Sequence, residues 1–275
     1  GLSGTVIGQM NACGRPVLAV DVPSGLNATT GAAEGECVRA DWTCTMGLPK
    51  RGFFFHPGRT LVGLLHVVDI GIPRKAFEKV GVRDNVLTPE EAARALPERT
   101  ATGHKGSFGT VVVLAGSVGY TGAAALTANS ALRSGAGLVL LGVPESLNDV
   151  LETKLTEVIT RPLPETEARS LSNQAIDGVR ALLEKADAVA VGPGLSTDAG
   201  TQQLVRTVLG EVSAPCVIDA DGLNALTIEH ISGRPGDVPL VLTPHPGEMS
   251  RLTGRGVTEI LDSREQVARD LASEC

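Results

Sequence analysis

Short apolar runs that each stop at Gly, Pro or Asp are the feature of this sequence that most constrains its fold. In the second half of the chain such runs lie at 110–115, 188–191, 216–219 and 240–242, separated by segments long enough for helices. Strands that alternate with helices in this way form a mainly parallel sheet covered by helices on both faces. We therefore predict an α/β fold.

Further elements complete this alternation. We expect helices at about 122–134, 167–185, 199–210 and 257–272, a short helix from about residue 222, a strand at 138–143 and an extended segment at 157–161. The helix at 257–272 is expected to have no strand to pack on.

The first part of the chain is shorter and contains more loops. Strands are expected at 17–21, 43–47 and 63–70, and a short helix and linker at 74–87. Thr88 and Pro89 then open another helix, because Thr caps helices and Pro suits the first helical position. We place the domain boundary between residues 84 and 85, which gives domains of residues 1–84 and 85–275.

Composition and charge narrow the class of protein. The chain has 275 residues, of which 42% are apolar and 20% charged, as globular domains do. Its net charge of −7 argues against nucleic acid as a partner. The longest apolar runs are far shorter than the ~20 residues that span a bilayer, so we expect no membrane partner and a cytoplasmic location.

The cysteines carry no metal or redox signature. They lie at positions 13, 37, 44, 216 and 275, without a C-x-x-C pair or metal-ligand spacing. We expect reduced thiols.

The strand at 17–21 ends in an acidic loop, Asp21-Val22-Pro23-Ser24-Gly25. Parallel α/β folds bind ligands at the carboxyl ends of their strands. Asp21 is either a turn or cap residue, or part of a cation or ribose site with Ser24. One strand and a short amphipathic stretch at 6–12 cannot bury both faces of a parallel sheet, so we expect further chain before Gly1.

Glycine-rich loops also follow strands in the second half of the chain. The segment 116–124 opens a helix, and its G-x-x-G-x-x-G spacing differs from the dinucleotide fingerprint. The segment 103–107 is not a Walker A loop. Each is either a tight turn or a place where backbone approaches a ligand.

Two other strand ends carry polar candidates. His245 lies between two prolines, which keep it out of a helix, and Glu248 follows three residues later. It is either structural or functional. Asp221 follows Asp219 and is either a ligand contact or the cap of the next helix.

Together these segments resemble the bifunctional NAD(P)H-hydrate repair enzymes, in which an epimerase domain precedes an ADP-dependent dehydratase domain. The epimerase-like segments are 17–25, 31, 49–52, 57–58 and 68–73. The dehydratase-like segments are 87–89, 96–97, 99, 104–106, 116–117, 119–124, 133–137, 192–194, 219–221 and 243–248. The resemblance implies the C-terminal half of a Rossmann-like epimerase domain followed by an incomplete ribokinase-like α/β domain.

The resemblance also implies roles for residues of the first domain. Asp21 would contact the hydrated nicotinamide nucleotide and act as proton donor or acceptor, and Ser24 would bind a potassium ion. Substrate would also be contacted by the tail of a glycine-rich loop, Gly1, Leu2, Ser3 and Gly4.

In the second domain, the resemblance implies that Ala123, Gly194 and His245 line the site for the hydrated nucleotide. The dehydratase's Lys-Gly strand and its G-T-G-D segment, which holds phosphates and supplies a base, would lie beyond Cys275. An N-terminal half with an Asn-Asn-Gly motif and a second potassium ligand would precede Gly1. We expect both sheet edges next to these segments to expose apolar side chains.

The implied function is nicotinamide nucleotide repair. The R and S forms of hydrated NADH or NADPH, the small-molecule partner, would be interconverted. The S form would then be dehydrated to NAD(P)H with ADP or ATP as phosphoryl donor, Mg²⁺ and K⁺. We expect the full-length protein to be a homo-oligomer. The alternatives are a ribokinase-like small-molecule kinase and a non-catalytic nucleotide-binding or scaffold protein.

Overall fold

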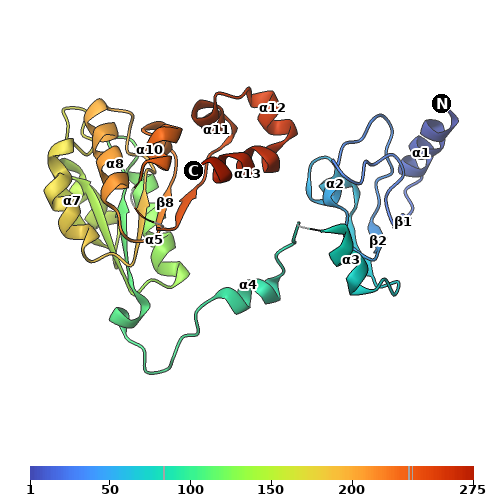
Figure 1. Cartoon of the computed structure of the whole chain (residues 1–275), viewed down its shortest axis with the longest axis horizontal. Coiled ribbons are helices and arrows are strands. Elements are labelled where there is room, and N and C mark those ends of the chain that lie inside the picture. The colour runs from blue at the N-terminus through green and yellow to red at the C-terminus, as the bar shows by residue number, and fades with distance from the viewer. Residues whose placement is uncertain (83, 235, 237) are drawn as a thin grey trace. The chain divides into compact units, whose positions relative to one another are not determined.

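The protein forms two compact units, Gly1–Pro97 and Glu98–Cys275, which we call unit 1 and unit 2 (Figure 1). The computed structural model describes residues 1–82, 84–234, 236 and 238–275. The domain boundary predicted between residues 84 and 85 stays a prediction.

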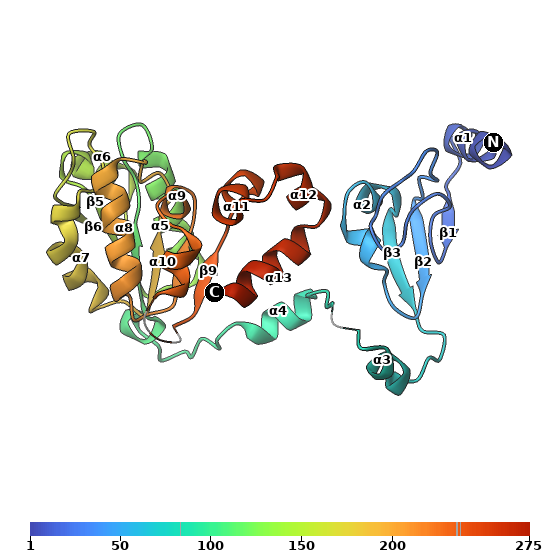
Figure 2. The ribbon, with the colours of Figure 1, turned by 45° about the horizontal axis from the view of Figure 1, so that its top comes forward.

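Unit 1 is built on three parallel strands, β1 (Leu18–Val20), β2 (Trp42–Met46) and β3 (Leu64–Val68), paired in that order (Figure 2). All three expected strands are therefore confirmed, with slightly shifted ends. Its helices are α1 (Leu2–Ala12), the 3₁₀ turn η1 (Arg51–Phe54), α2 (Gly58–Leu61), α3 (Arg74–Val80) and α4 (Pro89–Ala95).

The two faces of this sheet are covered very differently. On one face Thr43 and Thr45 are fully buried, and the Thr43 hydroxyl donates to the backbone oxygen of Val62 over 2.7 Å. Side chains alternate between the two faces of a strand, and four large apolar side chains of the opposite face are exposed to solvent. They are Leu18, Val20, Trp42 and Leu64, exposed by 57%, 63%, 41% and 59%. This face of the sheet therefore exposes apolar side chains, whereas the expectation for the sheet edges stays a prediction.

The expected helix opening at Thr88 is also confirmed. The Thr88 hydroxyl accepts a hydrogen bond from the backbone N–H of Glu91 over 3.2 Å. The Glu91 carboxylate accepts one from the N–H of Thr88 over 2.9 Å. This reciprocal capping box, with Pro89 in the first turn, fixes where α4 begins.

Unit 2 alternates strands and helices as predicted. Its strands are β4 (Thr110–Leu114), β5 (Leu138–Pro144), β6 (Ile159–Leu163), β7 (Ala188–Val191), β8 (Cys216–Ile218) and β9 (Leu240–Leu242). Its α-helices are α5 (Thr121–Ser134), α6 (Asn148–Lys154), α7 (Ile176–Leu183), α8 (Ala199–Glu211), α9 (Asp221–Asn224), α10 (Ile228–Ser232), α11 (Pro246–Thr253), α12 (Val257–Asp262) and α13 (Arg264–Glu274). Its 3₁₀ turns are η2 (Lys105–Phe108), η3 (Glu145–Leu147) and η4 (Asn173–Ala175).

These strands form one parallel sheet in the order β6-β5-β4-β7-β8-β9. Successive residues of β4 point into two different cores. Val112 and Leu114 enter the core that α7 and α8 cover, and Val113 enters the core beneath α5 and α6. Helices therefore pack on both faces of the sheet, which confirms the predicted α/β architecture.

The helix expected at 167–185 begins later than predicted. Residues 166–172 form a loop that η4 and α7 follow. The Thr201 hydroxyl of α8 lies 2.8 Å from the Ser170 hydroxyl, and the backbone N–H of Thr166 donates to the Ser170 carbonyl. Hydroxyl side chains that bond locally compete with helix formation, which explains the late start.

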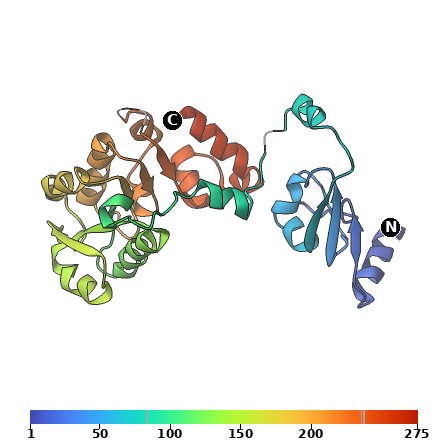
Figure 3. The same cartoon turned by 90° about the horizontal axis from the view of Figure 1, so that it is seen from below.

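The expected helix at 257–272 is two helices, α12 and α13, separated at Ser263. They join α11 around a small core of Met249, Ile260, Val267 and Leu271. The ribbons of these helices, in red, lie together near the C-terminus in Figures 2 and 3, and Figure 2 labels β9 beside them. Leu242 of β9 packs against this core, so the expectation that this segment has no strand to pack on is wrong.

None of the helices formed by the described residues combines the length and the apolar character needed to cross a membrane.

The unequal faces of the unit 1 sheet lead to a matched prediction. Val62 is 1% exposed and Val20 is 63% exposed. Val62→Thr should cost about 1–3 kcal/mol of unfolding free energy because it buries an unpaired hydroxyl. Val20→Thr should change it by less than about 0.5 kcal/mol. Trp42 is the one tryptophan of the sequence, so its fluorescence during urea unfolding reports unit 1 alone. Equal urea midpoints for the two variants would contradict the burial of Val62 and the exposure of Val20.

Candidate functional site

The loops that follow β4, β7, β8 and β9 lie side by side because these strands are parallel. Parallel strands send their carboxyl ends to one edge of a sheet, where α/β proteins place their ligands. Hydrogen bonds and close backbone approaches connect each of these loops to the next. The connected segments are residues 116–123, 192–196, 219–221 and 243–248. The glycine, aspartate and histidine segments selected from the sequence of this unit thus form one row.

Ala123 and Gly194 are brought together at one end of this row. Gly194 has a φ of +68°, and a Cβ added to it would lie 2.7 Å from the Cβ of Tyr120 and 3.1 Å from that of Ala123. The buried hydroxyl of Ser117 donates to the Gly194 carbonyl over 2.8 Å. The start of α5 and the loop after β7 are therefore packed as closely as glycine allows.

The loops after β7 and β8 also touch through backbone alone. A Cβ at Gly192 would lie 1.8 Å from the carbonyl oxygen of Asp219, and the φ of Gly192 is +129°. A side chain at Gly192 would force the two loops apart. The glycines of the Gly192-Pro193-Gly194 segment are thus required by packing against both neighbouring loops.

Asp221 is not the helix cap that the sequence favoured. Ala220 occupies the N-cap position of α9, and Asp221 is the first helical residue. The Asp221 carboxylate accepts hydrogen bonds from the backbone N–H of Ser196 over 2.9 Å and from the Asn224 amide over 3.1 Å. It therefore ties the loop after β7 to α9, and the cap interpretation is wrong.

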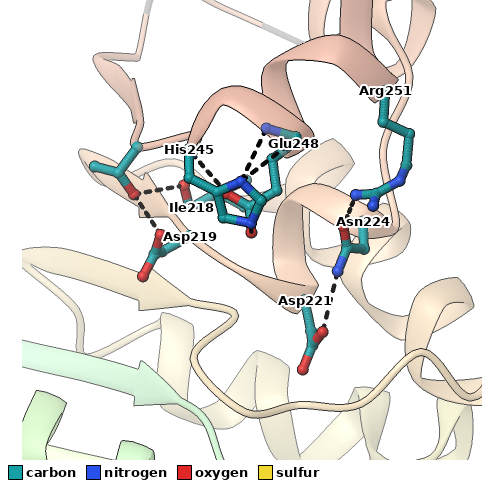
Figure 4. Close-up of polar contacts among 9 residues, drawn as sticks. Ile218, Asp219, Asp221, Asn224, His245, Glu248 and Arg251 are labelled. Atoms are coloured by element: carbon teal, nitrogen blue, oxygen red, sulfur yellow. Dashed lines mark hydrogen bonds and ion pairs between the residues drawn. The ribbon is translucent and has the colours of Figure 1, made fainter. Parts of the chain in front are cut away.

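Asp219 connects the row to β9. One of its carboxylate oxygens accepts a hydrogen bond from the Thr243 hydroxyl over 2.8 Å (Figure 4). Between the two aspartates, Ala220 has a φ of 51° and a ψ of −120°, a conformation that side chains rarely adopt. Such strained residues persist only where surrounding contacts hold them, and they cluster at functional sites.

His245 caps helix α11. Its Nδ1 accepts hydrogen bonds from the backbone N–H groups of Gly247 and Glu248, over 3.0 and 3.3 Å. The Nε2 atom lies 3.2 Å from the carboxylate of Glu248, a residue only 6% exposed (Figure 4). An acceptor nitrogen carries no proton, so we infer that the neutral ring holds its proton on Nε2. His245 therefore has a structural role, whatever else it does.

A further pair of residues in this region was missed from the sequence. Arg251 of α11 donates to the Asn224 side chain, which in turn donates to Asp221 (Figure 4). This links α11 to the row of loops. The spacing of Asn224 three residues after Asp221 is a signal that could have suggested the helical pair.

In unit 1, Asp21 stands at the end of β1 with a φ of 66°. Its Oδ1 atom accepts three hydrogen bonds, from Lys50 Nζ at 2.7 Å, the Met46 backbone N–H at 3.0 Å and the Thr45 hydroxyl at 3.1 Å. The hydrogen bond from Lys50, followed by that from Met46, lowers the pKa of Asp21 below its ordinary value. Asp21 is thus held as a carboxylate.

The other predicted residues of unit 1 are less tightly held. Ser24 lies in the same loop as Asp21 and is exposed, and its backbone carbonyl accepts from the N–H of Val38 over 2.9 Å. The segment Gly1–Gly4 forms the start of α1, and Gly4 lies near the Glu36 side chain. No contact within the described residues joins Gly1–Gly4 to Asp21.

Within the described ranges, no group of three or more His, Cys, Asp or Glu side chains could hold a metal ion. The five cysteines are free, as expected. Burial raises the pKa of Cys216 to about 12, so this thiol stays protonated and unreactive.

A cavity of about 480 Å³ borders the last loop of the row, and Thr243, Pro244 and Pro246 are among its lining residues. Its walls come mainly from β9 and α11–α13, with Leu242, Met249 and Leu271 among its lining residues. Ala123, Gly194 and His245 are not in its lining. The cavity therefore meets the candidate site at the loop after β9, and the C-terminal helices form most of its other walls.

Two family profiles match the chain, and both bear on these sites. The NAD(P)H-hydrate dehydratase profile matches residues 111–275, and the profile of the YjeF-related protein N-terminus matches residues 3–52. The first contains the whole row of loops, and the second contains Asp21 and Lys50.

Relatives agree with these profiles. The bifunctional NAD(P)H-hydrate repair enzyme Nnr of Moorella thermoacetica is 45% identical over all of this chain, which spans 52% of that relative. The chain thus covers about half the length of such relatives. A crystal structure of the ADP/ATP-dependent NAD(P)H-hydrate dehydratase of Bacillus subtilis, co-crystallised with ATP and Mg²⁺, is 34% identical with a TM-score of 0.56. The match covers 67% of this chain and 61% of that one.

A ribokinase-like protein of Enterococcus faecalis shares the fold at 22% identity, with a TM-score of 0.54, over 68% of this chain and 66% of that one. The parallel sheet, the loops that follow its strands and the match over residues 111–275 agree on one conclusion. The chain belongs to the NAD(P)H-hydrate dehydratase family.

Proposed function

We propose that unit 2 binds hydrated NADH or NADPH for dehydration at the expense of ADP or ATP. The observation that carries this proposal is the contact between Ala123 and Gly194, in one row with His245 at the carboxyl edge of the sheet. The Bacillus subtilis relative, which is an ADP/ATP-dependent dehydratase, supports the choice of nucleotide.

The reaction explains why a kinase-like fold suits a dehydratase. Hydroxide is a poor leaving group, so the hydroxyl at C6 of the nicotinamide ring first receives a phosphoryl group from the nucleotide. The C6–O bond then breaks with its electron pair leaving on phosphate, and a proton leaves C5. A C5–C6 double bond forms, which restores the reduced cofactor.

The proposed roles follow from size and position. Ala123 and Gly194 have almost no side chain, so a flat ring can approach the backbone between α5 and the loop after β7. His245 presents an exposed ring from the first turn of α11. Because Nδ1 is engaged in the helix cap and Nε2 lies beside the Glu248 carboxylate, the exposed face of the ring is the part proposed to meet a ligand.

Mg²⁺ is proposed to arrive with the nucleotide. Asp219 and Asp221 supply carboxylate oxygens at the strand edge, which is the donor type that Mg²⁺ prefers. Two carboxylates do not make a dedicated cage, and magnesium usually binds through one or two carboxylates plus substrate phosphates. Bound there, it would neutralise phosphate charge.

For unit 1 we propose epimerisation of the two hydrate forms, with Asp21 at the nicotinamide ring and Gly1–Gly4 contacting the substrate. Ser24 is proposed as one potassium ligand, since it is exposed and lies three residues after Asp21 in the same loop. The homo-oligomer and the cytoplasmic location stay predictions.

The complete protein that contains this chain provides the test of function. Incubated with chemically hydrated NADH, ADP and Mg²⁺, it should restore the reduced-nicotinamide absorbance, and both hydrate epimers should be consumed. A small-molecule kinase would instead accumulate a phosphate ester without recovery of absorbance. A scaffold protein would consume no ADP. Either result would overturn the repair function.

Gly194 gives a matched test of the site. Gly194→Ala should weaken binding of hydrated NADH at least about tenfold, since a Cβ collides with Tyr120 and the positive φ costs about 1–3 kcal/mol. Gly210 in α8 has open space around it, so Gly210→Ala should stabilise the helix by about 0.5–1 kcal/mol and leave binding unchanged. Calorimetric titration of both variants measures the difference. Equal affinities would remove Gly194 from the site.

His245 can be separated into a structural and a binding role. His245→Ala should cost about 0.5–2 kcal/mol because α11 loses its cap. His245→Asn keeps a capping acceptor and should recover most of that stability in thermal unfolding followed by circular dichroism. Because the proposal places the ring against the substrate, neither variant should recover affinity for hydrated NADH. Recovery of affinity by the Asn variant would reduce His245 to a cap.

A further inference from the structure

The two carboxylate oxygens of Asp21 have unequal surroundings. Oδ1 receives three hydrogen bonds, from Thr45, Met46 and Lys50. Within the described residues, no hydrogen bond or ion pair is recorded for Oδ2. The side chain of Asp21 is 42% exposed, so its second oxygen remains accessible to a ligand.

Lys50 has no hydrogen left to give to a ligand. Its Nζ donates to Asp21 Oδ1 over 2.7 Å, to the Met46 carbonyl over 2.9 Å and to the Leu48 carbonyl over 3.2 Å. An ammonium group has three donors, and all three are used. The two carbonyl contacts fix the ammonium at the end of β2, and the third contact fixes the carboxylate.

We propose that Lys50 is a positioning residue that holds Asp21 Oδ1 inward, so that Oδ2 is the oxygen that meets the substrate and accepts a proton from it. This inference rests on the proposed epimerase function of unit 1. It decides between the two roles open to Asp21 from sequence. Asp21 accepts the first proton rather than donating it, because Lys50 keeps it charged.

The step balances as a ring opening and closing. Asp21 Oδ2 takes the proton of the C6 hydroxyl, the oxygen forms a C=O bond, and the C6–N1 bond breaks with its electron pair moving to N1. The C5–C6 bond then rotates, and N1 attacks the opposite face of the carbonyl. The proton returns from Oδ2 to the oxygen. Nothing is oxidised or consumed.

The charges around Asp21 agree with this role. Lys50, in the segment after β2, forms an ion pair with Asp21. Thr45 and Met46 of β2 do not titrate, and Cys44 meets Asp21 through its backbone carbonyl. Because the pKa of Asp21 is lowered, its side chain remains a carboxylate down to a lower pH than an ordinary aspartate does. A base of this kind works above its pKa and fails as the pH falls through it.

Carbon-13 NMR of aspartate carboxyl groups in the 275-residue chain tests the positioning directly, with Asp21→Asn to assign the signal. Lys50→Met should raise the pKa of Asp21 by about one unit or more, a tenfold change in proton affinity. Lys75→Met, an exposed lysine on α3, should leave it unchanged. An Asp21 titration that is the same in Lys50→Met and in the unmodified chain would overturn the proposal.

Two further variants guard against misfolding. Trp42 fluorescence reports whether unit 1 remains folded in each variant. Thr45→Val removes one donor to Oδ1 but retains Lys50, so its shift should be smaller than that of Lys50→Met. Lys50→Arg keeps the charge but not the compact three-donor geometry, so it should recover only part of the pKa shift. Complete recovery by Arg would mean that charge alone, not positioning, matters.

Kinetics of the complete protein provide the second readout. The rate of epimerisation should stay constant from neutral pH down to about pH 4, near the ordinary aspartate pKa. At lower pH the rate should decrease. Lys50→Met should move that acid limb upward and lower kcat about tenfold, with KM little changed. A rate that rises as the pH falls would make Asp21 an acid and refute the proposal. If the unmodified protein does not epimerise, the proposed function fails, while the NMR titration still decides the role of Lys50.

Discussion

Parallel hydrogen bonding between β7 and its two neighbours is the interaction on which the site of unit 2 depends. It places β7 about 4.8 Å from each of its neighbours, β4 and β8, whatever the sequence. The loops that follow these three strands therefore lie very close together. Gly192 and Gly194 allow this close approach, because atoms of the neighbouring loops occupy the space that a side chain at either position would need. The small residues expected to receive the substrate are thus also those that let the sheet close.

Backbone strain accompanies the acids in both units. Asp21 follows β1 with a φ of 66°, and Ala220, which lies between Asp219 and Asp221, has a φ of 51°. Each costs about 1–3 kcal/mol relative to relaxed backbone. The carboxylate of Asp21 is itself hydrogen-bonded to a second chain segment, and so are the carboxylates of Asp219 and Asp221 on either side of Ala220. Removing those carboxylates would therefore change backbone conformation as well as charge.

The sequence predicted the parts of the fold that follow from periodicity and punctuation. Strands such as 188–191 and 240–242 and the Thr88 cap were expected at their observed positions. What it could not supply depends on contacts between distant segments. The loop at 166–172 is non-helical because Thr201 bonds to Ser170, and Asp221 is not a cap because Ser196 claims its carboxylate. The partnership of Lys50 with Asp21, across 29 positions, has no local pattern at all.

The partners of an acid, rather than its place at a strand end, decide what it can do. Asp21 shares one oxygen with an ammonium group and two neutral donors, so its charge is compensated and its free oxygen can take a proton from a neutral hydroxyl. Asp219 and Asp221 accept from a hydroxyl, a backbone N–H and an amide, which are all neutral. Their charges remain uncompensated by these partners, which favours a cation at that edge. Two strand ends with the same residue type thus agree with different proposed ligands, a neutral hydroxyl in unit 1 and a metal-bound nucleotide in unit 2.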